Sequence, residues 1–278
     1  MRLGLFDSGI GGLTVLQAIR SAFPTLDVVY LGDTARVPYG IKSARSIERY
    51  AQQAVRCLVD TADVSAVVVA CNTASALATG PLRQQFDDLP ILSVIEPGAA
   101  QAVQAVSTVE GLGHVGVLAT ESTVRGGAYE RAIHAIDPRI KVTSQACQLL
   151  VALAEEGWVD GEVARLSVER YLRSLCAKAG SWPAAIVLGC THFPLLKPII
   201  QEVAQSMLSD AAAIHVIDSS QAVASQLLDQ LDGMTEQGGG TTQFLATDGA
   251  QRFADVGSRF LGYAIDPDDV EIVDLHLV

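Results

Sequence analysis

The sequence contains one pattern twice, in Ala66-Val67-Val68-Val69-Ala70-Cys71-Asn72-Thr73 and in Ala185-Ile186-Val187-Leu188-Gly189-Cys190-Thr191-His192. Each stretch runs from apolar residues through one small residue to a cysteine, and polar residues follow. Short apolar runs rich in β-branched residues are typical of strands that a parallel sheet buries on both faces. The repetition therefore predicts two similar halves, in each of which a buried strand ends at a cysteine, and it indicates an internal duplication.

Other short apolar runs alternate with longer segments of helical periodicity. The runs lie at 3–6, 28–31, 91–95, 115–119 and 214–217. The clearest helix is predicted at 44–62, where apolar residues recur at three-and-four spacing. Strands that alternate with helices form βαβ units, so we expect an α/β fold in which both halves carry doubly wound, mainly parallel sheets. The turn chemistry of Ile95-Glu96-Pro97-Gly98 predicts the end of the first half, and the final segment could pack on either half.

The composition describes an ordinary packed globule. The chain has 278 residues, of which 49% are hydrophobic and 18% charged. This length suits about two domains, and the composition excludes a disordered chain. Nineteen Lys and Arg against 31 Asp and Glu give a net charge of −12, so general attraction to nucleic acid or to an anionic membrane is disfavoured. An anionic substrate then needs a local binding site.

Location and redox state are also indicated by the sequence. The N-terminus reaches Asp7 too early for the apolar core of a signal peptide, and polar residues interrupt the uncharged stretch 64–82, so no membrane span is expected. The five cysteines are an odd number without C-x-x-C pairs, which argues against a disulfide framework and a zinc site. We therefore expect a soluble, cytoplasmic protein with free thiols and no metal.

Polar residues gather where the predicted strands end. Asp7-Ser8, Cys71-Asn72-Thr73 and Cys190-Thr191-His192 each follow an apolar run, and open α/β sheets bind ligands at the carboxyl ends of their strands. Helices that begin there attract carboxylate or phosphate groups through their free N–H groups. The glycines from Gly9 onward predict a tight strand-to-helix turn, since Thr14 stands where a dinucleotide-binding loop needs a third glycine.

The two matching cysteines carry the main chemical hypothesis. A single buried Cys is usually a small hydrophobic residue, but two in matching positions before polar side chains favour reactive thiols. Asp7 and His192 are the proton partners that the motifs offer, and this reading is favoured over a helix N-cap for Asp7 and a structural imidazole for His192. Two thiols facing each other across a pocket can remove a proton from carbon on one side and deliver one on the other, which inverts a stereocentre. No lysine in the motifs offers a Schiff base to pyridoxal phosphate, so the sequence does not demand that cofactor.

Four blocks of the sequence resemble the signature blocks of the glutamate racemase family, within the aspartate/glutamate racemase superfamily. They are Phe6-Asp7-Ser8-Gly9-Ile10-Gly11-Gly12-Leu13-Thr14, Asp33-Thr34-Ala35-Arg36-Val37-Pro38-Tyr39-Gly40, Ala70-Cys71-Asn72-Thr73-Ala74-Ser75 and Gly189-Cys190-Thr191-His192-Phe193-Pro194. The segments 95–98 and 244–247 extend the resemblance over nearly the whole chain. The chain departs from the family at Gln148 and Ala152, where proline is usual.

The resemblance implies two pseudo-symmetric α/β domains with the active site in the cleft between them. Residues 1–96 plus 211–278 would form the first domain and 97–210 the second. It also implies racemisation of L-glutamate to D-glutamate for peptidoglycan synthesis, without cofactor or metal. Glutamate would be the small-molecule partner, and a homodimer is expected.

The resemblance further assigns roles to individual residues. Cys71 would take the α-proton from D-glutamate, with Asp7 tuning it, and Cys190 would take it from L-glutamate, with His192 beside it and Glu155 near His192. The predicted substrate-binding residues are Ser8, Pro38, Tyr39 and Gly40 for the γ-carboxylate, Asn72, Thr73 and Thr191 for the α-carboxylate, and Thr120 as a further lining residue. Asp7 would also meet the substrate ammonium.

Three other functions stay open at this point. The nearest is an aspartate racemase or a related isomerase acting on another small carboxylic acid, which differs in pocket depth. A thiol hydrolase would use one Cys-His pair, Cys190 with His192, and would not need Cys71. A non-catalytic domain that closes around an anionic ligand also fits two halves with a site between them.

Overall fold

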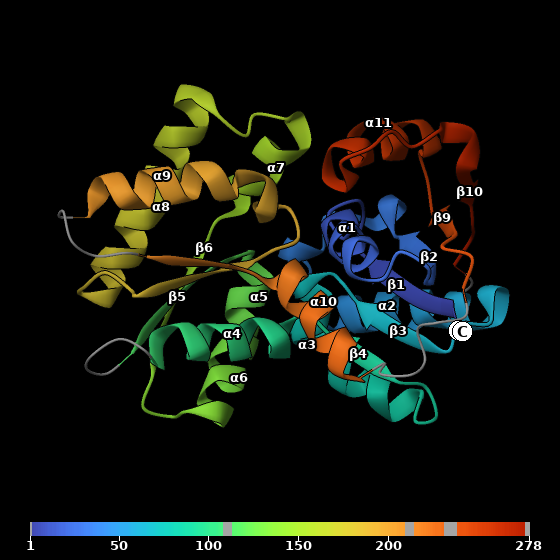
Figure 1. Cartoon of the computed structure of the whole chain (residues 1–278), viewed down its shortest axis with the longest axis horizontal. Helices are drawn as coiled ribbons and strands as arrows, with labels where there is room; N and C mark the ends of the chain where they lie inside the picture. The colour runs from blue at the N-terminus through green and yellow to red at the C-terminus, as the bar shows by residue number, and fades with distance from the viewer. Residues whose placement is uncertain (1, 108–112, 209–213, 231–237, 276–278) are drawn as a thin grey trace.

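Two parallel sheets, one in each half of the molecule, organise the chain (Figure 1). The computed structural model describes residues 2–107, 113–208, 214–230 and 238–275. The first sheet has the order β10-β9-β2-β1-β3-β4 and the second the order β6-β5-β7-β8. The strands are β1 (Arg2–Asp7), β2 (Asp27–Gly32), β3 (Ala66–Val69), β4 (Ile91–Ser93), β5 (His114–Ala119), β6 (Lys141–Ala146), β7 (Ala185–Gly189), β8 (His215–Asp218), β9 (Thr242–Ala246) and β10 (Val270–Ile272).

Helices connect and flank these strands. They are α1 (Leu13–Ala22), α2 (Ala44–Ala62), α3 (Asn72–Gln85), α4 (Ile95–Ser107), α5 (Glu121–Gly126), α6 (Ala128–Ile136), α7 (Gln148–Glu156), α8 (Gly161–Ala179), α9 (Lys197–Met207), α10 (Ser219–Gln230) and α11 (Ala250–Leu261). Short 3₁₀ helices lie at Thr34–Arg36, Tyr39–Ile41, Phe193–Leu196 and Pro267–Asp269. The α/β prediction is therefore confirmed, and every predicted strand is found. None of the helices within the described residues is both long and apolar enough to span a membrane.

The predicted helix at 44–62 is confirmed as α2. Its N-cap Ser43 accepts a hydrogen bond from the Ser46 N–H at 3.3 Å, which satisfies one of the free donors of the first turn. Buried residues at three-and-four spacing, among them Ile47, Ala51 and Leu58, pack on the first sheet. The helix therefore follows directly from the apolar period of its sequence.

The two sheets share a core arrangement of strands. The order β2-β1-β3 in the first sheet is repeated as β6-β5-β7 in the second, with the same chain order and parallel pairing. Asp7 ends β1 while Thr120 follows β5, and Cys71 follows β3 while Cys190 follows β7. The duplicated pattern of the sequence thus corresponds to a duplicated topology.

Two predicted boundaries differ from the structure. Residues 95–98 do not form a turn but begin α4, where Pro97 is tolerated because the first N–H groups of a helix have no partner within it. Strand β8 pairs with β7 in the second sheet, although we expected 211–278 in the first domain. The apolar residues of β8 are buried on both faces of the second sheet, and the chain returns to the first sheet only at β9. The division into two domains otherwise stays a prediction.

The two halves are joined by a continuous core. One cluster of buried side chains includes Leu5 and Val68 of the first sheet together with Leu118 and Ile186 of the second. Helix α10 packs against α1 on one side and α4 on the other.

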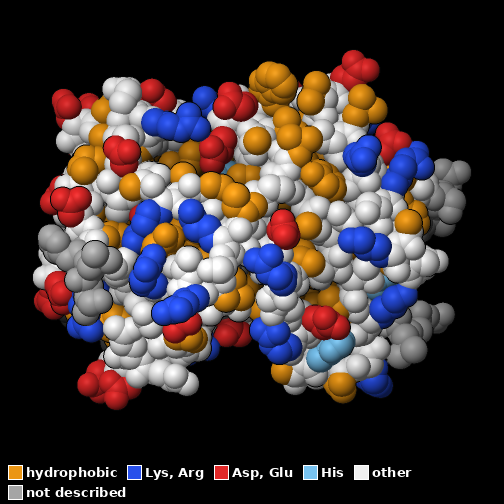
Figure 2. Space-filling model, turned by 180° about the vertical axis from the view of Figure 1, so that it is seen from behind, with side chains coloured by type: hydrophobic (Ala, Val, Ile, Leu, Met, Phe, Trp, Pro, Cys, Tyr) orange, Lys and Arg blue, Asp and Glu red, His pale blue; other side chains and the backbone are white. Residues whose placement is uncertain are grey.

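The charged side chains are unevenly distributed on the face that Figure 2 shows. Lys and Arg cross the middle of this face, while Asp and Glu lie mainly toward its margins.

Candidate active site

The carboxyl ends of β1, β3, β5 and β7 border one cavity of about 160 Å³. Of the predicted site residues, twelve line it, namely Ser8, Pro38, Tyr39, Gly40, Cys71, Asn72, Thr73, Thr120, Glu155, Cys190, Thr191 and His192. Asp7 does not line the cavity but lies buried directly behind Ser8. The structure therefore brings the predicted residues together, while their individual roles stay predictions.

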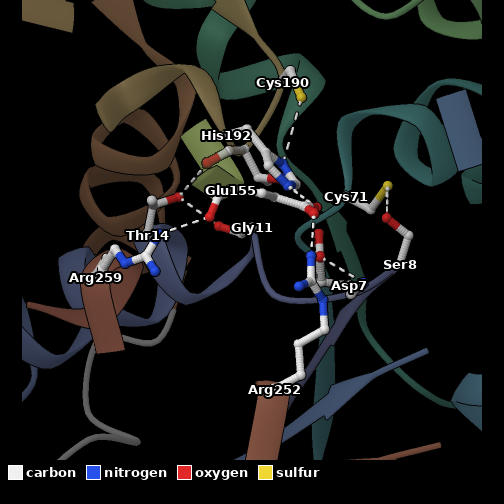
Figure 3. A network of polar contacts seen from close by, with 12 residues as sticks. Asp7, Ser8, Gly11, Thr14, Cys71, Glu155, Cys190, His192, Arg252 and Arg259 are labelled. Carbon is white, nitrogen blue, oxygen red and sulfur yellow. Dashed lines mark hydrogen bonds and ion pairs between the residues drawn. The ribbon is translucent and has the colours of Figure 1, made fainter. Parts of the chain in front are cut away.

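Cys71 lies at the point where β3 passes into α3. It is the N-cap residue of α3, only 5% exposed, and its thiol donates a hydrogen bond to Ser8 Oγ at 3.3 Å (Figure 3). Burial raises the pKa of the Cys71 thiol to about 12, and the negative charge of Asp7 adds to this effect. In the unliganded protein Cys71 is therefore a neutral thiol, ready to donate a proton.

Asp7 is a fully buried carboxyl group at the end of β1. Its Oδ2 accepts a hydrogen bond from the Gly9 N–H at 2.9 Å, while Oδ1 has no partner. Burial raises the pKa of Asp7, against the opposing influence of His192 and of the backbone N–H groups of the glycine turn. Among the described residues, Oδ1 is therefore a buried acceptor without a donor.

Cys190 stands at the head of a chain of polar contacts (Figure 3). Its sulfur lies 3.9 Å from His192 Nδ1, and His192 Nε2 lies 3.0 Å from Glu155 Oε1. Glu155 Oε2 in turn accepts a hydrogen bond from Arg252 at 3.2 Å. Burial alone would lower the pKa of His192, but the contacts with Cys190 and Glu155 outweigh it and raise the pKa to about 10. His192 is therefore an imidazolium beside the Cys190 sulfur.

Glu155 is held in place although two prolines of the family pattern are missing. Helix α7 runs unbroken from Gln148 to Glu156, with Gln148 and Ala152 accommodated inside it. The hydrogen bond from His192 lowers the pKa of Glu155, and Arg252 adds to the shift. Because Glu155 is thus an anion, it fixes both the orientation and the charge of the imidazole.

The glycine turn of the first half meets the Cys190 loop of the second. A methyl group at Gly11 would collide with Thr191 Oγ1 and the His192 ring, so this close approach requires glycine. The hydroxyl of Thr14 donates to the Thr191 carbonyl at 3.1 Å. The turn predicted between β1 and α1 therefore positions the second half of the site.

Uncharged donors surround the space between the thiols. Asn72 Nδ2 donates to Tyr129 Oη at 2.8 Å, which leaves Asn72 Oδ1 buried without a partner. The hydroxyl of Thr73 lies 2.9 Å from that of Thr120 and 3.1 Å from that of Thr123. These rotatable hydroxyl groups can turn toward a bound carboxylate without leaving their places.

Hydrogen bonds to the buried side chain of Asp33 anchor the Pro38-Tyr39-Gly40 segment. The Tyr39 ring is buried, and its hydroxyl donates to Asp33, a fully buried carboxylate. Asp33 also accepts hydrogen bonds from Arg36 Nε at 2.6 Å and from Thr247 at 3.0 Å. The Tyr39 hydroxyl is therefore engaged by Asp33, and the contact of the 38–40 backbone with the ligand stays a prediction.

Other residues of the cavity wall were not predicted. They are Gly9, Ile10, Thr34, Val37, Gln148, Val151, Asp248, Gly249, Arg252 and Phe253. Several lie on α7 and α11, far in sequence from the cysteine motifs. Gly9, Ile10, Thr34 and Val37 lie in the signature blocks of the sequence, and Gln148 is a departure from the family pattern. The contact between Arg252 and Glu155 has no local signature.

Comparisons with known proteins agree with this arrangement. The sequence model of Asp/Glu/Hydantoin racemases matches residues 12–227. The glutamate racemase of Aquifex aeolicus (strain VF5) is 42% identical over 267 residues, 96% of each chain, and that of Geobacter metallireducens is 44% identical over 94% of this chain and 92% of its own. The crystal structure of glutamate racemase from Francisella tularensis in complex with D-glutamate superimposes with a TM-score of 0.86 at 34% identity, covering 99% of this chain and 97% of the other. The chain therefore belongs to the Asp/Glu/Hydantoin racemase family.

Proposed function

We propose that this protein interconverts L- and D-glutamate without a cofactor, by a two-base mechanism with Cys71 and Cys190. The observation that carries the proposal is that both thiols, one from each half, line the same cavity. Substrate identity is supported by the relatives at about 40% identity, which are glutamate racemases.

The two thiols have different surroundings in the unliganded protein. Cys71 is a neutral thiol, and the sulfur of Cys190 lies 3.9 Å from the imidazolium of His192. In the L-to-D direction the Cys190 thiolate removes the α-proton and the electron pair remains on the substrate carbon. The Cys71 S–H then gives its proton to the opposite face and becomes the thiolate. The reverse direction begins from that second state.

The surrounding polar groups would hold the substrate. Asn72, Thr73 and Thr191 are proposed for the α-carboxylate, which gains negative charge as the proton leaves, so their hydrogen bonds strengthen in the transition state. The unpartnered oxygen of Asp7 is proposed for the ammonium group. Ser8 and the 38–40 segment are proposed for the γ-carboxylate, and Thr120 for the wall between the two carboxylates.

The biological role follows from the product. D-Glutamate is a building block of peptidoglycan, so we propose that the enzyme supplies cell-wall synthesis. All five cysteines are free, which suits the reducing cytoplasm that we propose as its location. A homodimer is proposed by analogy with the family.

The function is tested by incubating the purified protein with L-glutamate in D₂O, without pyridoxal phosphate. We expect loss of optical rotation together with deuterium at the α-carbon, and much slower exchange with aspartate. Absence of exchange with glutamate would refute the function, and a preference for aspartate would transfer it to the shorter acid.

The mechanism is tested by Cys71→Ser and Cys190→Ser. We expect each substitution to reduce kcat by about 10²- to 10⁴-fold, the usual contribution of a positioned acid or base. Cys176→Ser is the matched control, since Cys176 is half-buried on α8 and does not line the cavity. Full racemase activity in either catalytic variant would exclude the two-base mechanism, and activity that depends on Cys190 alone, with an acyl adduct, would indicate a hydrolase.

A further inference from the structure

Gln148 has a buried amide oxygen that no group among the described residues satisfies. It is the first residue of α7, it lines the cavity, and its Oε1 is buried without a hydrogen-bond partner. A buried polar atom without a partner costs free energy, so its presence at a ligand cavity indicates a partner that arrives with the ligand. The mechanism proposed above does not use this residue.

The amide lies at the end of the cavity formed by Gly40 and Thr120. A methyl group built on Gly40 would lie 2.8 Å from Thr120 Cβ and 3.2 Å from Gln148 Oε1, so the three residues converge on one spot. The proposed function assigns this end of the cavity, with Ser8 and the 38–40 segment, to the γ-carboxylate of glutamate. Gln148 therefore adjoins Gly40, one of the residues proposed for the γ-carboxylate of the substrate.

The chemistry of an amide makes it a suitable partner for that carboxylate. The oxygen and nitrogen of a Gln amide have the same shape, and a turn of 180° about the last bond exchanges them. With Nε2 in the unsatisfied position, the amide donates a hydrogen bond to a carboxylate oxygen, whereas the proline usual in the family offers no donor. The position at the N-terminal end of α7 adds a favourable field for an anion.

We propose that Gln148 is a specificity-determining residue that recognises the side-chain carboxylate of the substrate through its amide N–H. The inference rests on the proposed function, because it takes the substrate to be an amino acid with a second carboxylate. It concerns affinity: the hydrogen bond is made equally in the ground state and the transition state, so it acts on KM and leaves kcat nearly unchanged.

Two substitutions test the proposal. Gln148→Met keeps the size of the side chain and removes its hydrogen bond, and Gln148→Glu places a negative charge against the carboxylate. We expect the KM for glutamate to rise about 10-fold in the first and about 100-fold in the second, with kcat within about 3-fold of wild type. Gln148→Glu should keep the fold, because acidic residues are favoured in the first turn of a helix.

Leu149→Glu is the matched control. It adds the same charge one residue along α7, on a side chain that is 48% exposed and does not line the cavity, so its KM should equal that of wild type. An unchanged KM in Gln148→Glu would overturn the proposal, and so would a fall in kcat and thermal midpoint at constant KM, which is the pattern of a structural residue. Wild-type racemisation of glutamate, measured in the same assay, reports separately on the proposed function.

Discussion

At His192, burial and polar contacts act on the pKa of one imidazole in opposite directions. The raised pKa of about 10 depends on Glu155 as well as on Cys190. Glu155→Gln removes one of the two charges that favour the imidazolium, and burial then has more weight. We expect kcat/KM to fall about 10-fold or more at neutral pH and its alkaline limb to move to lower pH, toward the ordinary value of 6.5. The pH profile of kcat/KM measures this shift.

The same residue links stability to pH. Because the folded-state pKa of His192 is raised above 6.5, its stabilising contribution is fully present below pH 6.5 and is lost as pH rises through about 10. The wild-type protein should therefore lose more stability between pH 7 and pH 10 than Glu155→Gln does. Denaturant unfolding at both pH values makes the comparison, and an equal loss in the two proteins would mean that Glu155 does not set the charge of His192.

Asn72 should matter for turnover as well as for affinity. Its hydrogen bond to Tyr129 fixes the amide at the cavity wall, and its Oδ1 has no partner within the described part of the chain. If it binds the α-carboxylate as that group gains charge, Asn72→Ala lowers kcat about 10- to 100-fold and also raises KM. Tyr129→Phe is the control, because it removes only the hydroxyl that accepts from Asn72 and leaves the amide in place. Equal kinetic losses in both variants would assign the effect to packing, not to substrate contact.

At the scale of elements, two arginines of α11 bind the C-terminal end of α7. Arg252 pairs with the Glu155 carboxylate, and Arg259 donates to the Glu155 carbonyl at 2.7 Å. In Figure 1 these two helices face each other across the top of the molecule, α7 from the second half and α11 from the first. The sheets thus place the strands that end at the two cysteines, while the contact of α7 with α11 holds Glu155 beside His192.

Two ion pairs of similar exposure allow the effect of Arg252 on activity to be distinguished from its effect on stability. In the Arg252–Glu155 pair the side chains are 66% and 28% exposed, and in the Arg173–Glu169 pair on α8 they are 67% and 33% exposed. Arg252→Met and Arg173→Met should each change the free energy of unfolding by less than about 1 kcal/mol, because exposed pairs contribute little. Only Arg252→Met should lower kcat/KM, because Arg252 pairs with the glutamate that contacts His192, whereas Arg173 pairs with Glu169. A similar kinetic loss in both variants would refute this coupling.

The elements also show what the sequence could and could not predict. Strands with continuous apolar runs, such as β3 and β7, were predicted correctly because burial on both faces leaves a clear signal. Strand β6, Lys-Val-Thr-Ser-Gln-Ala, was missed because it lies at a sheet edge and is largely polar. The motifs at the two cysteines stand out in the sequence because they follow strands, whereas Arg252 reaches the candidate site only through the packing of α11, which no local pattern encodes.

At the scale of the whole molecule, the duplication would suggest two units that unfold separately, but the packing does not. The cluster that contains Leu5 and Ile186 runs through both sheets, and α10 is packed between α1 and α4. Neither half can expose its share of this core without opening the other. The cavity also belongs to both halves, since residues that follow β3 and residues that follow β7 both contribute to its wall.

Thermal unfolding should therefore occur in one cooperative transition despite the two sheets. Scanning calorimetry is expected to give a single peak whose calorimetric and van't Hoff enthalpies agree. Glutamate bound between the halves stabilises both together, and at 100 times its dissociation constant it should add about 2.7 kcal/mol and move the whole peak upward by a few degrees. Sodium chloride at the same ionic strength is the control for general salt effects. Two peaks, of which glutamate moves only one, would show that the shared core is not strong enough to couple the halves and that the substrate is held by one half alone.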